Sequence, residues 1–513
     1  MKSLAARKTL SWVLVGGLLV STLGTPIAAA TSARDILGVA HSAGRYNFTE
    51  EDYLNEGADR ILELGSRVIK VFLTPEKIQD FYSFNSDWSP ATTDVVELAQ
   101  RPYFQSLFAK PFSTFILVVS PVTGSPQFLD GFTHSEAEAE RDQMYRLAKY
   151  FLTTYANSDK TFILQNWEGD HLLRYGLGAG VDPNPVRIQG MIDWWNVRQD
   201  GVRQARQEVG EQGVEVLHAA EVNLVEDAMA GKVSATNNVL PATESDLYSY
   251  SSWDVKFTPQ ELTRALDYLA AKAPDSRRFG GRNIYLGEYG MGKDSGAPEG
   301  QRYERIRQLM EAALGWGVRY AVYWQVFCNE PLRHYNGRPR NKDLRGFWLV
   351  RPDGATTPMW DTLGGQLRAA LHRASFSSFS NQYFSVSADH SVNAVPGTRG
   401  DVWRNFTLKD LNGGSLEDGD TVTLQAHDGL YLTVEAGAGG RVFARSSTAT
   451  KPELFTIQAV DGNGHILPGD AVAFQSVRSS KYLSTEAGGR GAIRALRPVA
   501  GRTEVFKYVV PEE

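Results

Sequence analysis

Two glutamates follow β-rich runs of the chain, and each has a glycine close behind it. Glu168 comes directly after the run Thr161–Trp167, and Glu288 closes the run Asn283–Glu288. A glycine permits the sharp turn that would carry a side chain over the mouth of a fold. Two carboxyl groups that face each other across a cleft can cleave an acetal, because one protonates the leaving oxygen while the other attacks the anomeric carbon or activates water. We therefore take Glu168 and Glu288 as the candidate catalytic pair.

The alternation of side chains along a strand supports this placement. Successive side chains point to opposite faces of a strand, so each glutamate should share a face with the residues two and four positions before it. These sets are Leu164, Asn166 and Glu168 in one run, and Ile284, Leu286 and Glu288 in the other. We expect each glutamate to continue the face that its set defines.

Short β-rich runs alternate with helical patterns from Asp35 to about Ala370. We expect eight strands, at Ile36–His41, Arg67–Leu73, Thr114–Ser120, Thr161–Trp167, Val214–Ala220, Asp246–Ser251, Asn283–Glu288 and Tyr320–Phe327. Several runs are apolar throughout, which is typical of parallel strands covered on both faces. Capping signals mark the starts of three helices between them, at Thr49–Asp52, at Ser135 with Glu138, and at Thr258 with Glu261. Eight such units predict a closed (β/α)₈ barrel. An open doubly wound sheet is the alternative, but no G-x-G-x-x-G follows the first strand.

Motifs at the ends of the last strands resemble those of the large clan of retaining glycoside hydrolases. Gly287–Gly290 resembles the nucleophile segment, and Tyr323–Gln325 resembles the end of strand eight, where such enzymes carry a tryptophan beneath the sugar. Gly346–Gly354, followed by Pro358 and Trp360, resembles a hairpin that often closes these barrels. The resemblance implies that Glu288 is the nucleophile, that Glu168 is the general acid/base, and that O-glycosidic bonds are cleaved with retention. Retention requires carboxyl groups about 5 to 5.5 Å apart.

The strand ends and the resemblance also supply candidate substrate contacts. Tyr248 or Tyr250, at the end of strand six, matches the family's tyrosine that hydrogen-bonds the nucleophile, and Lys70 stands where many members keep an arginine. Trp253 and Trp324 are candidates for stacking on sugar rings. The expected substrate contacts are His41, Lys70, Asn166, Asn223, Tyr248, Tyr250, Trp253 and Trp324.

One position departs from the family pattern. The residue before the acid/base glutamate is usually asparagine, whereas here it is Trp167, with Asn166 one place earlier. This departure motivates a second hypothesis, a catalytically inactive carbohydrate-binding protein. A secreted scaffold that recognises protein partners is a third. Asp170 could compete with Glu168 as the acid, and Glu221, beyond strand five, is expected to be a solvated charge at the rim.

The sequence contains no motif for a cofactor or a metal. Neither a G-x-S-x-G nucleophile elbow nor a phosphate-binding G-x-x-x-x-G-K-[ST] loop occurs. His171 follows Asp170 closely, but no second cluster stands at metal-ligand spacing. We therefore expect no cofactor and no metal. Cys328, the single cysteine, lies in an apolar run and is expected to be a buried small hydrophobe.

The first thirty residues have the pattern of a secretory signal peptide. Lys2, Arg7 and Lys8 form a basic start, Trp12–Val20 is a short apolar core, and Ala28–Ala30 offers a cleavage site. The apolar core is too short for a spanning helix, so we expect export to the extracellular space or the periplasm. The net charge of −6, with no basic block after the signal peptide, argues against nucleic acid and anionic membrane surfaces as partners. A carbohydrate substrate is what the resemblance to glycoside hydrolases implies.

From about residue 371 the chain contains three copies of one unit. The copies align at Tyr383, Tyr431 and Tyr482, with spacings of 48 and 51 residues, and at Phe406, Phe455 and Phe506, with spacings of 49 and 51. A threefold repeat of this length with four short strands each predicts a β-trefoil. Gly419–Leu424 and Gly469–Phe474 resemble fascin-type trefoil repeats. We expect a catalytic domain over residues 34–370 and a fascin- or ricin-like trefoil over 371–513, with glycan as its candidate ligand.

Overall fold

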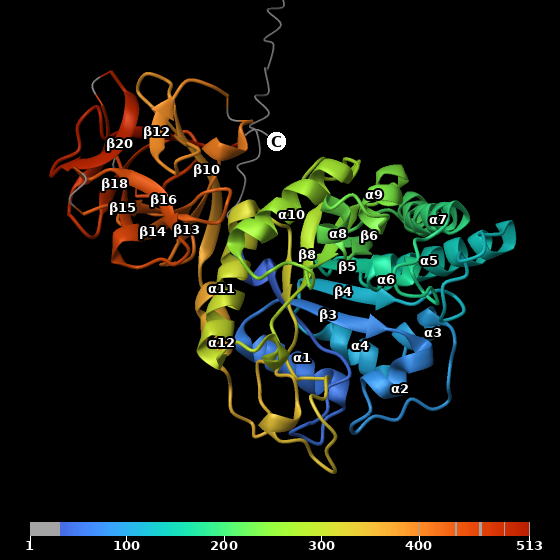
Figure 1. Cartoon of the computed structure of the whole chain (residues 1–513). Helices are drawn as coiled ribbons and strands as arrows, with labels where there is room; N and C mark the ends of the chain where they lie inside the picture. Colours follow the sequence, from blue (N-terminus) through green and yellow to red (C-terminus); the bar gives the residue numbers. More distant parts are fainter. Residues whose placement is uncertain (1–30, 399, 437–438, 461–463, 487, 512–513) are drawn as a thin grey trace, which may run out of the picture.

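The computed structural model describes residues 31–398, 400–436, 439–460, 464–486 and 488–511. Residues 1–30, where the sequence predicts a signal peptide, lie outside the described residues. The described chain forms a barrel of strands and helices followed by an all-β region (Figure 1). Among the helices of this described part, none combines the length and the apolar character that crossing a membrane requires.

Within the described residues, eight parallel strands close into a barrel, as the sequence predicted. They are β2 (Leu37–Ala40), β3 (Val68–Leu73), β4 (Thr114–Val119), β5 (Lys160–Gln165), β6 (Val214–Val222), β7 (Leu247–Ser251), β8 (Ile284–Tyr289) and β9 (Ala321–Tyr323). The last strand pairs with the first through Leu37 and Ala321, so the sheet is closed rather than doubly wound. The carboxyl ends of all eight strands therefore meet at one mouth.

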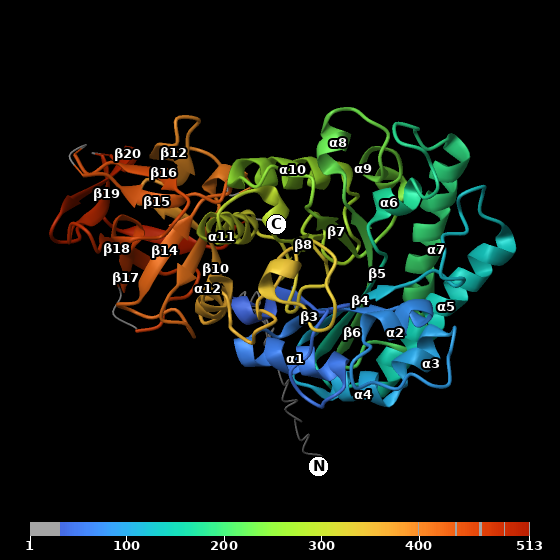
Figure 2. The same ribbon diagram turned by 60° about the horizontal axis from the view of Figure 1, so that its bottom comes forward.

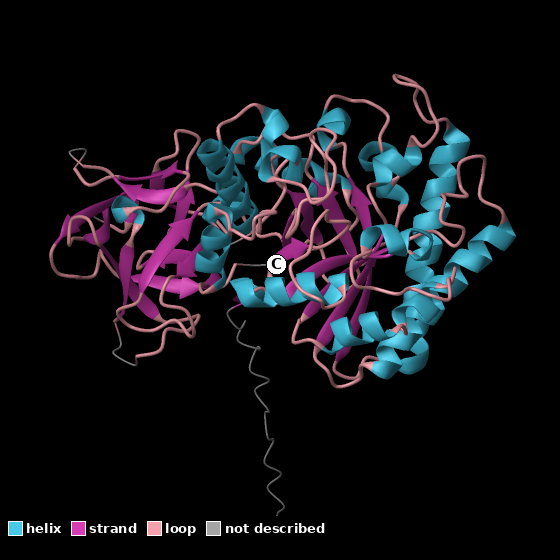
Figure 3. Cartoon of the chain, turned by 90° about the horizontal axis from the view of Figure 1, so that it is seen from below, coloured by secondary structure: helices cyan, strands magenta, loops and turns pink. Residues whose placement is uncertain are grey.

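Helices cover the outside of the barrel (Figures 1 and 3). The longer ones are α1 (Tyr53–Leu64), α4 (Pro102–Ala109), α5 (His134–Thr154), α7 (Pro185–Val209), α10 (Pro259–Lys272), α11 (Glu299–Trp316) and α12 (Pro358–Leu367). Short helices lie in the loops, namely α2 (Ile78–Phe81), α3 (Val95–Ala99), α6 (Gly169–Leu173), α8 (Val225–Met229) and α9 (Ala235–Asn238). Asp52 and Thr258 cap α1 and α10 within the expected segments.

The start of α5 differs from the expectation. The capping box consists of Thr133 and Glu136, not Ser135 and Glu138. The Thr133 hydroxyl accepts the Glu136 N–H at 3.3 Å, and the Glu136 carboxylate accepts the Thr133 N–H at 2.8 Å. Ser135 lies one residue inside the helix, so its N–H and side chain cannot take the capping role.

Two strand boundaries differ from the sequence prediction in a way that matters for the site. β5 ends at Gln165, two residues earlier than expected, so Glu168 lies in the turn that follows. β6 continues to Val222, two residues beyond the expected Ala220, so Glu221 lies inside a strand. Its pairing with β7 runs from Ala219 to Val222, which holds these last residues in the sheet.

The all-β region is built from twelve strands in the described residues. They are β10 (Ala370–Ser378), β11 (Tyr383–Val386), β12 (Val392–Val395), β13 (Phe406–Asp410), β14 (Thr421–Gln425), β15 (Tyr431–Val434), β16 (Val442–Ser446), β17 (Phe455–Ala459), β18 (Ala471–Ser476), β19 (Tyr482–Glu486), β20 (Arg490–Arg497) and β21 (Phe506–Val509). The three repeat tyrosines and the three repeat phenylalanines each begin a strand. A separate short strand, β1 (Thr31–Ser32), pairs with β10.

The pairing in this region follows the repeat. β10, β13, β14, β17, β18 and β21 pair in a ring that returns to β10, and all of these pairs are antiparallel. β11 with β12, β15 with β16, and β19 with β20 form one hairpin per repeat. The buried apolar side chains of this region form a core of their own, from Ala374 to Tyr508.

The two regions pack against each other along α11, which lies between the barrel strands and the all-β strands (Figures 1 and 2). Arg373 of β10 donates hydrogen bonds to the carbonyl oxygens of Gly315, at 3.1 Å, and Trp316, at 2.9 Å, in the last turn of α11. A guanidinium group is well suited to the unpaired carbonyls at a helix end. Gly315 also allows close approach, because a Cβ there would lie 3.0 Å from Gly429 Cα.

Candidate active site

A cleft of about 660 Å³ lies at the carboxyl ends of the barrel strands. Glu168 and Glu288 both line it, together with Trp167, Trp253 and Trp324. The two carboxyl groups come from opposite parts of the barrel, one from the turn after β5 and the other from β8. The sequence-derived pair therefore borders one common cavity.

Glu288 reaches the cleft through an irregularity in β8 rather than by simple alternation. The hydroxyl of Tyr285 donates to the side chain of Gln165 on β5, a strand that is not its neighbour, so Tyr285 points into the barrel. Simple alternation would then send Leu286 and Glu288 outward together. The pairing with β7 shifts by one residue between Leu286 and Glu288. Such a bulge re-aims a side chain, and it turns Glu288 inward, so Leu286 and Glu288 do not share the face that the sequence predicted.

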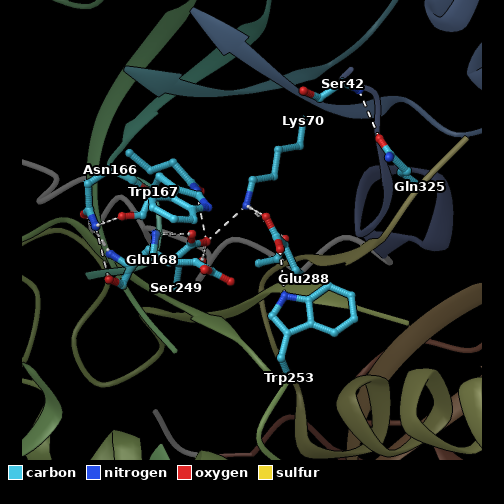
Figure 4. Close-up of polar contacts among 12 residues, drawn as sticks. Ser42, Lys70, Asn166, Trp167, Glu168, Ser249, Trp253, Glu288 and Gln325 are labelled. Atoms are coloured by element: carbon cyan, nitrogen blue, oxygen red, sulfur yellow. Dashed lines mark hydrogen bonds and ion pairs between the residues drawn. The ribbon is translucent and has the colours of Figure 1, made fainter. Parts of the chain in front are cut away.

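Both oxygens of the Glu288 carboxylate are held (Figure 4). Lys70 Nζ donates to Oε1 at 2.8 Å, and Trp253 Nε1 donates to Oε2 at 2.9 Å. Burial raises the pKa of Glu288 to about 7; the Lys70 ammonium opposes this shift, and the charges of Glu221 and Glu168 add to it. The group is thus poised to change its charge near neutral pH, and Lys70 is the partner that favours the ionised form.

Lys70 and Glu221 form the floor beneath Glu168 and Glu288, the candidate catalytic pair. Both side chains are fully buried, and Lys70 Nζ lies 3.1 Å from Glu221 Oε2. The same Oε2 accepts from Gln165 Nε2 at 2.9 Å and from Ser249 Oγ at 2.8 Å. Burial lowers the pKa of Lys70, but Glu221 and Glu288 raise it by more, so the net shift is upward. Glu221 is therefore a buried structural carboxylate, which corrects its expected place as a solvated rim charge.

Glu221 also connects the floor to Glu168. Its Oε1 accepts the backbone N–H of Glu168 at 3.1 Å, and its own N–H donates to Asn166 Oδ1 at 3.0 Å. One carboxylate on β6 thus fixes the ammonium that binds Glu288 and the backbone that carries Glu168. This relay couples the positions of the two candidate catalytic groups.

Glu168 lies in a strained turn. Its φ is +22°, in a region that residues other than glycine rarely adopt. Because β5 ends at Gln165, whose side chain faces the interior, the predicted common face of Leu164, Asn166 and Glu168 is wrong, and the turn rather than the strand aims Glu168. Its Oε2 lies 2.6 Å from His171 Nδ1. Strain of this kind is commonly retained at functional sites.

Gly287 allows the floor to pack closely, which gives a test. A Cβ at this position would lie 2.0 Å from Ser249 Oγ and 2.5 Å from Glu221 Oε2. We expect Gly287→Ala to lower the free energy of unfolding by about 1–3 kcal/mol, as overpacking does, and to reduce activity because Glu221 must move. Gly300→Ala, in α11, is the matched control, since no atom lies within 4 Å of a Cβ added at this position. Equal urea midpoints for the two variants would mean that the floor is packed differently.

Five of the expected substrate contacts lie in the cleft or directly behind it. Asn166, Trp253 and Trp324 line the cleft. Lys70 lies beneath it and contacts Glu288. Asn223 lies one step behind, where its Oδ1 accepts the Asp170 N–H at 3.0 Å. In this arrangement Lys70 holds the Glu288 carboxylate, and Asn223 holds the backbone of Asp170.

His41 does not face the cleft. Its ring is fully buried against Tyr53, Tyr82 and Phe327, and its Nε2 lies 2.7 Å from the Tyr53 carbonyl oxygen. Burial lowers its pKa to about 4. The neutral ring is therefore part of an aromatic core. In this position His41 does not contact a substrate in the cleft.

The two tyrosines of β7 also point away from Glu288. Ser249, between them, faces the barrel interior and binds Glu221, so Tyr248 and Tyr250 face outward. The Tyr248 hydroxyl donates to the Thr243 carbonyl oxygen, and the Tyr250 hydroxyl donates to Asp254. The expected tyrosine hydrogen bond to Glu288 is therefore not made by these two residues, and the indole N–H of Trp253 donates to Glu288 instead.

Trp253 should act on Glu288 as well as border the cleft. Trp253→Phe keeps a ring against Phe347, whose centroid lies 5.4 Å away, but removes the N–H donor to Glu288. Hydrogen bonds to charged groups contribute about 1.5–3 kcal/mol, so we expect kcat to fall roughly 10- to 100-fold with little change in KM. Steady-state kinetics on one substrate measure both. An unchanged kcat with a raised KM would instead assign Trp253 to sugar stacking alone.

Two residues of this site, Gln165 and Ser249, gave no signal in the sequence beyond their place in strands. The buried position of Glu221 could have been predicted only if β6 had been extended by two residues. His171 was weighed as a metal ligand, whereas it contacts Glu168. In the ranges that the structure describes, no three His, Cys, Asp or Glu side chains form a group that could hold a metal ion.

Comparison with known proteins found no matching family model and no curated protein that matches in sequence. Solved structures that the chain resembles include a GH5_18 protein from Streptomyces cattleya in complex with Manβ1-4GlcNAc, at 14% identity and a TM-score of 0.44 over 65% of this chain and 80% of that chain. A GH39 β-xylosidase from Caulobacter crescentus has 12% identity and a TM-score of 0.40 over 68% and 79%. A Macrolepiota procera ricin B-like lectin in complex with lactose has 14% identity and a TM-score of 0.21 over 27% and 96%. At these values the likenesses concern the fold and assign no residue.

Proposed function

We propose that this chain is a retaining glycoside hydrolase in which Glu288 is the nucleophile and Glu168 the general acid/base. The observation that carries the proposal is that the two carboxyl groups that line one cleft have different hydrogen-bond partners. Glu288 has both oxygens held by N–H donors, one of them a buried ammonium. Glu168 has only Oε2 in such a contact, since within the described chain no hydrogen bond to its Oε1 is found.

These environments suit the two steps of retention. In the first step Glu288 attacks the anomeric carbon, the glycosidic C–O bond breaks, and Glu168 gives its proton to the leaving oxygen. In the second step Glu168 takes a proton from water, whose oxygen displaces Glu288 from the anomeric carbon. Lys70 supports the first step because it favours the ionised, nucleophilic form of Glu288. Trp167, Trp253 and Trp324 offer aromatic faces on which a sugar ring could pack.

The stereochemical outcome tests this assignment. The proposal expects the β/α configuration of the first-formed product to match that of the substrate, as followed by proton NMR of the anomeric signal during the first minutes of hydrolysis. An inverted product would mean that water attacks directly, with the carboxyl groups about 6.5–9.5 Å apart. Binding of glycans without any turnover would favour the alternative of an inactive carbohydrate-binding protein, for which Trp167 before Glu168 is the motive.

We further propose that the all-β region is a β-trefoil and that the protein is secreted. The six-stranded ring with one hairpin per repeat supports the first proposal, because it follows the threefold repeat in the sequence. The signal-peptide pattern of residues 1–30 supports the second. A trefoil beside a glycosidase barrel would act as a targeting module that binds glycan.

A further inference from the structure

His171 is the one titratable side chain that hydrogen-bonds the Glu168 carboxyl group in the described chain. Glu168 and His171 are three residues apart, across the start of α6, and Nδ1 lies 2.6 Å from Oε2. Asn223 Nδ2 lies 3.2 Å from the same Nδ1, and the Trp167 ring lies beside the imidazole at 5.8 Å between centroids. About half of the His171 side chain is exposed, at 51%. The imidazole therefore touches the carboxyl group on one side and solvent on the other.

The turn that makes this contact is fixed by the backbone. A Cβ on Gly169 would lie 2.4 Å from the Glu221 carbonyl oxygen and 2.8 Å from the Trp195 ring, so only glycine fits there. The Glu168 N–H is bound to Glu221. The close packing of Gly169 and the φ of +22° at Glu168 fix the backbone of this turn. The fixed backbone holds the Glu168 carboxyl group next to the His171 ring.

We propose that Glu168 and His171 act as one acid/base unit that shares a single exchangeable proton, with His171 as a positioning residue that sets the pH range of the acid. This inference rests on the proposed function. His171 Nδ1–H donates to Oε2 and leaves Oε1 to face the reacting oxygen. When Oε1 carries the proton, His171 is neutral. When Glu168 is ionised, the proton is on the solvent-facing Nε2, and the imidazolium stabilises the carboxylate.

The proton balance of the two steps follows. Oε1–H passes its proton to the leaving oxygen, and the resulting carboxylate is stabilised as His171 takes a proton from water at Nε2. In the second step Oε1 takes the proton of the attacking water, and Nε2 returns its proton to solvent. Two groups that share a proton titrate as a pair. The hydrogen bond to Glu168 raises the pKa of His171, against desolvation, in the direction that this coupling requires.

The other charges around the pair are already compensated. The Asp170 carboxylate accepts backbone N–H groups of Ala235, at 2.7 Å, and Asn223, at 3.1 Å. Arg174 donates to the Val233 carbonyl oxygen and contacts Asp182. On β6 and β8, Glu221 and Glu288 are both paired with Lys70. His171 is thus the titrating group best placed to answer a change of charge on Glu168.

The test compares His171→Gln with the wild type over pH 4–9. Glutamine can donate a hydrogen bond but cannot carry the proton. We expect the descending limb of kcat/KM to move by about one pH unit or more toward acid, and kcat/KM at pH 7 to fall about 10-fold or more. For a substrate whose leaving group needs no protonation, such as a dinitrophenyl glycoside, the kcat/KM of His171→Gln should fall little. An unmoved limb in an active variant, or equal losses on both substrates, would overturn the inference.

A second measurement needs no substrate. In NMR titrations of the histidine side chains, Glu168→Gln should lower the pKa of His171, because the carboxylate that favours imidazolium is gone. His171→Gln identifies the signal, and the other histidines provide internal controls. An unchanged His171 titration overturns the coupling. A chain in which this coupling is present but no glycoside is hydrolysed would instead overturn the proposed function.

Discussion

Glu288→Gln abolishes hydrolysis while the barrel stays folded. The amide cannot attack the anomeric carbon, so the expected fall in kcat is on the order of 10⁶-fold, the scale seen when another enzyme loses its nucleophile. The amide has the shape of the carboxyl group, and its single oxygen can accept a hydrogen bond from either Trp253 or Lys70. Release of reducing sugar, measured at high enzyme concentration, checks the result.

Stability provides the control for this variant. The folded-state pKa of Glu288 is raised to about 7, so its stabilising effect is complete at low pH and is lost as the pH rises through about 7. Glu288→Gln should therefore melt no lower than the wild type at pH 8. Glu138→Gln, an exposed change on α5, should retain full activity. Wild-type turnover by a folded Glu288→Gln protein would remove Glu288 from the mechanism.

Lys70→Met is expected to have the second largest effect, because Lys70 is fully buried between two carboxylates. An opposite charge at this distance lowers a carboxyl pKa by about 1–3 units. Its removal raises the pKa of Glu288 further above 7, so the ascending limb of kcat/KM moves to higher pH by a similar amount. At pH 6–7 the loss is then roughly 10- to 1000-fold. A pH–rate profile measures the shift.

The same change leaves Glu221 and Glu288 without their cation. Removing one partner of a buried ion pair costs about 3–5 kcal/mol, so the urea midpoint should fall as well. Lys70→Arg keeps the charge and separates the two effects: it should return the ascending limb toward its wild-type position even if packing lowers stability. A limb that stays in place in Lys70→Met would mean that Lys70 does not govern the ionisation of Glu288.

The sequence predicted the barrel and the two glutamates at its mouth because both follow from local patterns. Apolar runs of strand length repeat eight times, capping signals mark three of the helices between them, and a glycine follows each glutamate closely. What could not be predicted is how the side chains are aimed. The bulge between Leu286 and Glu288 and the early end of β5 at Gln165 each reverse a face. Such irregularities depend on pairing with neighbouring strands, which alternation within one strand does not report.

The contacts of the site were harder to predict than its acids. Trp253 was expected to stack on sugar but donates to Glu288, a role that had been given to a tyrosine of β7. Tyr248 and Tyr250 point outward because Ser249, which lies between them on β7, points into the barrel. Glu221 was missed because a carboxylate in a sequence looks solvated until the ammonium, amide and hydroxyl that satisfy it are placed around it. All three come from other strands of the barrel, far away in sequence.

The most direct test of the catalytic pair is covalent labelling with a 2-deoxy-2-fluoro glycoside that carries an activated leaving group. The fluorine slows both steps, and the good leaving group lets the first one proceed, so the glycosyl-enzyme accumulates. Peptide mass mapping should then place one sugar on Glu288, at the end of β8, and none on Glu168 or Glu221. An enzyme that hydrolyses glycosides but carries the label on a different residue, or takes no label at all, would contradict this account.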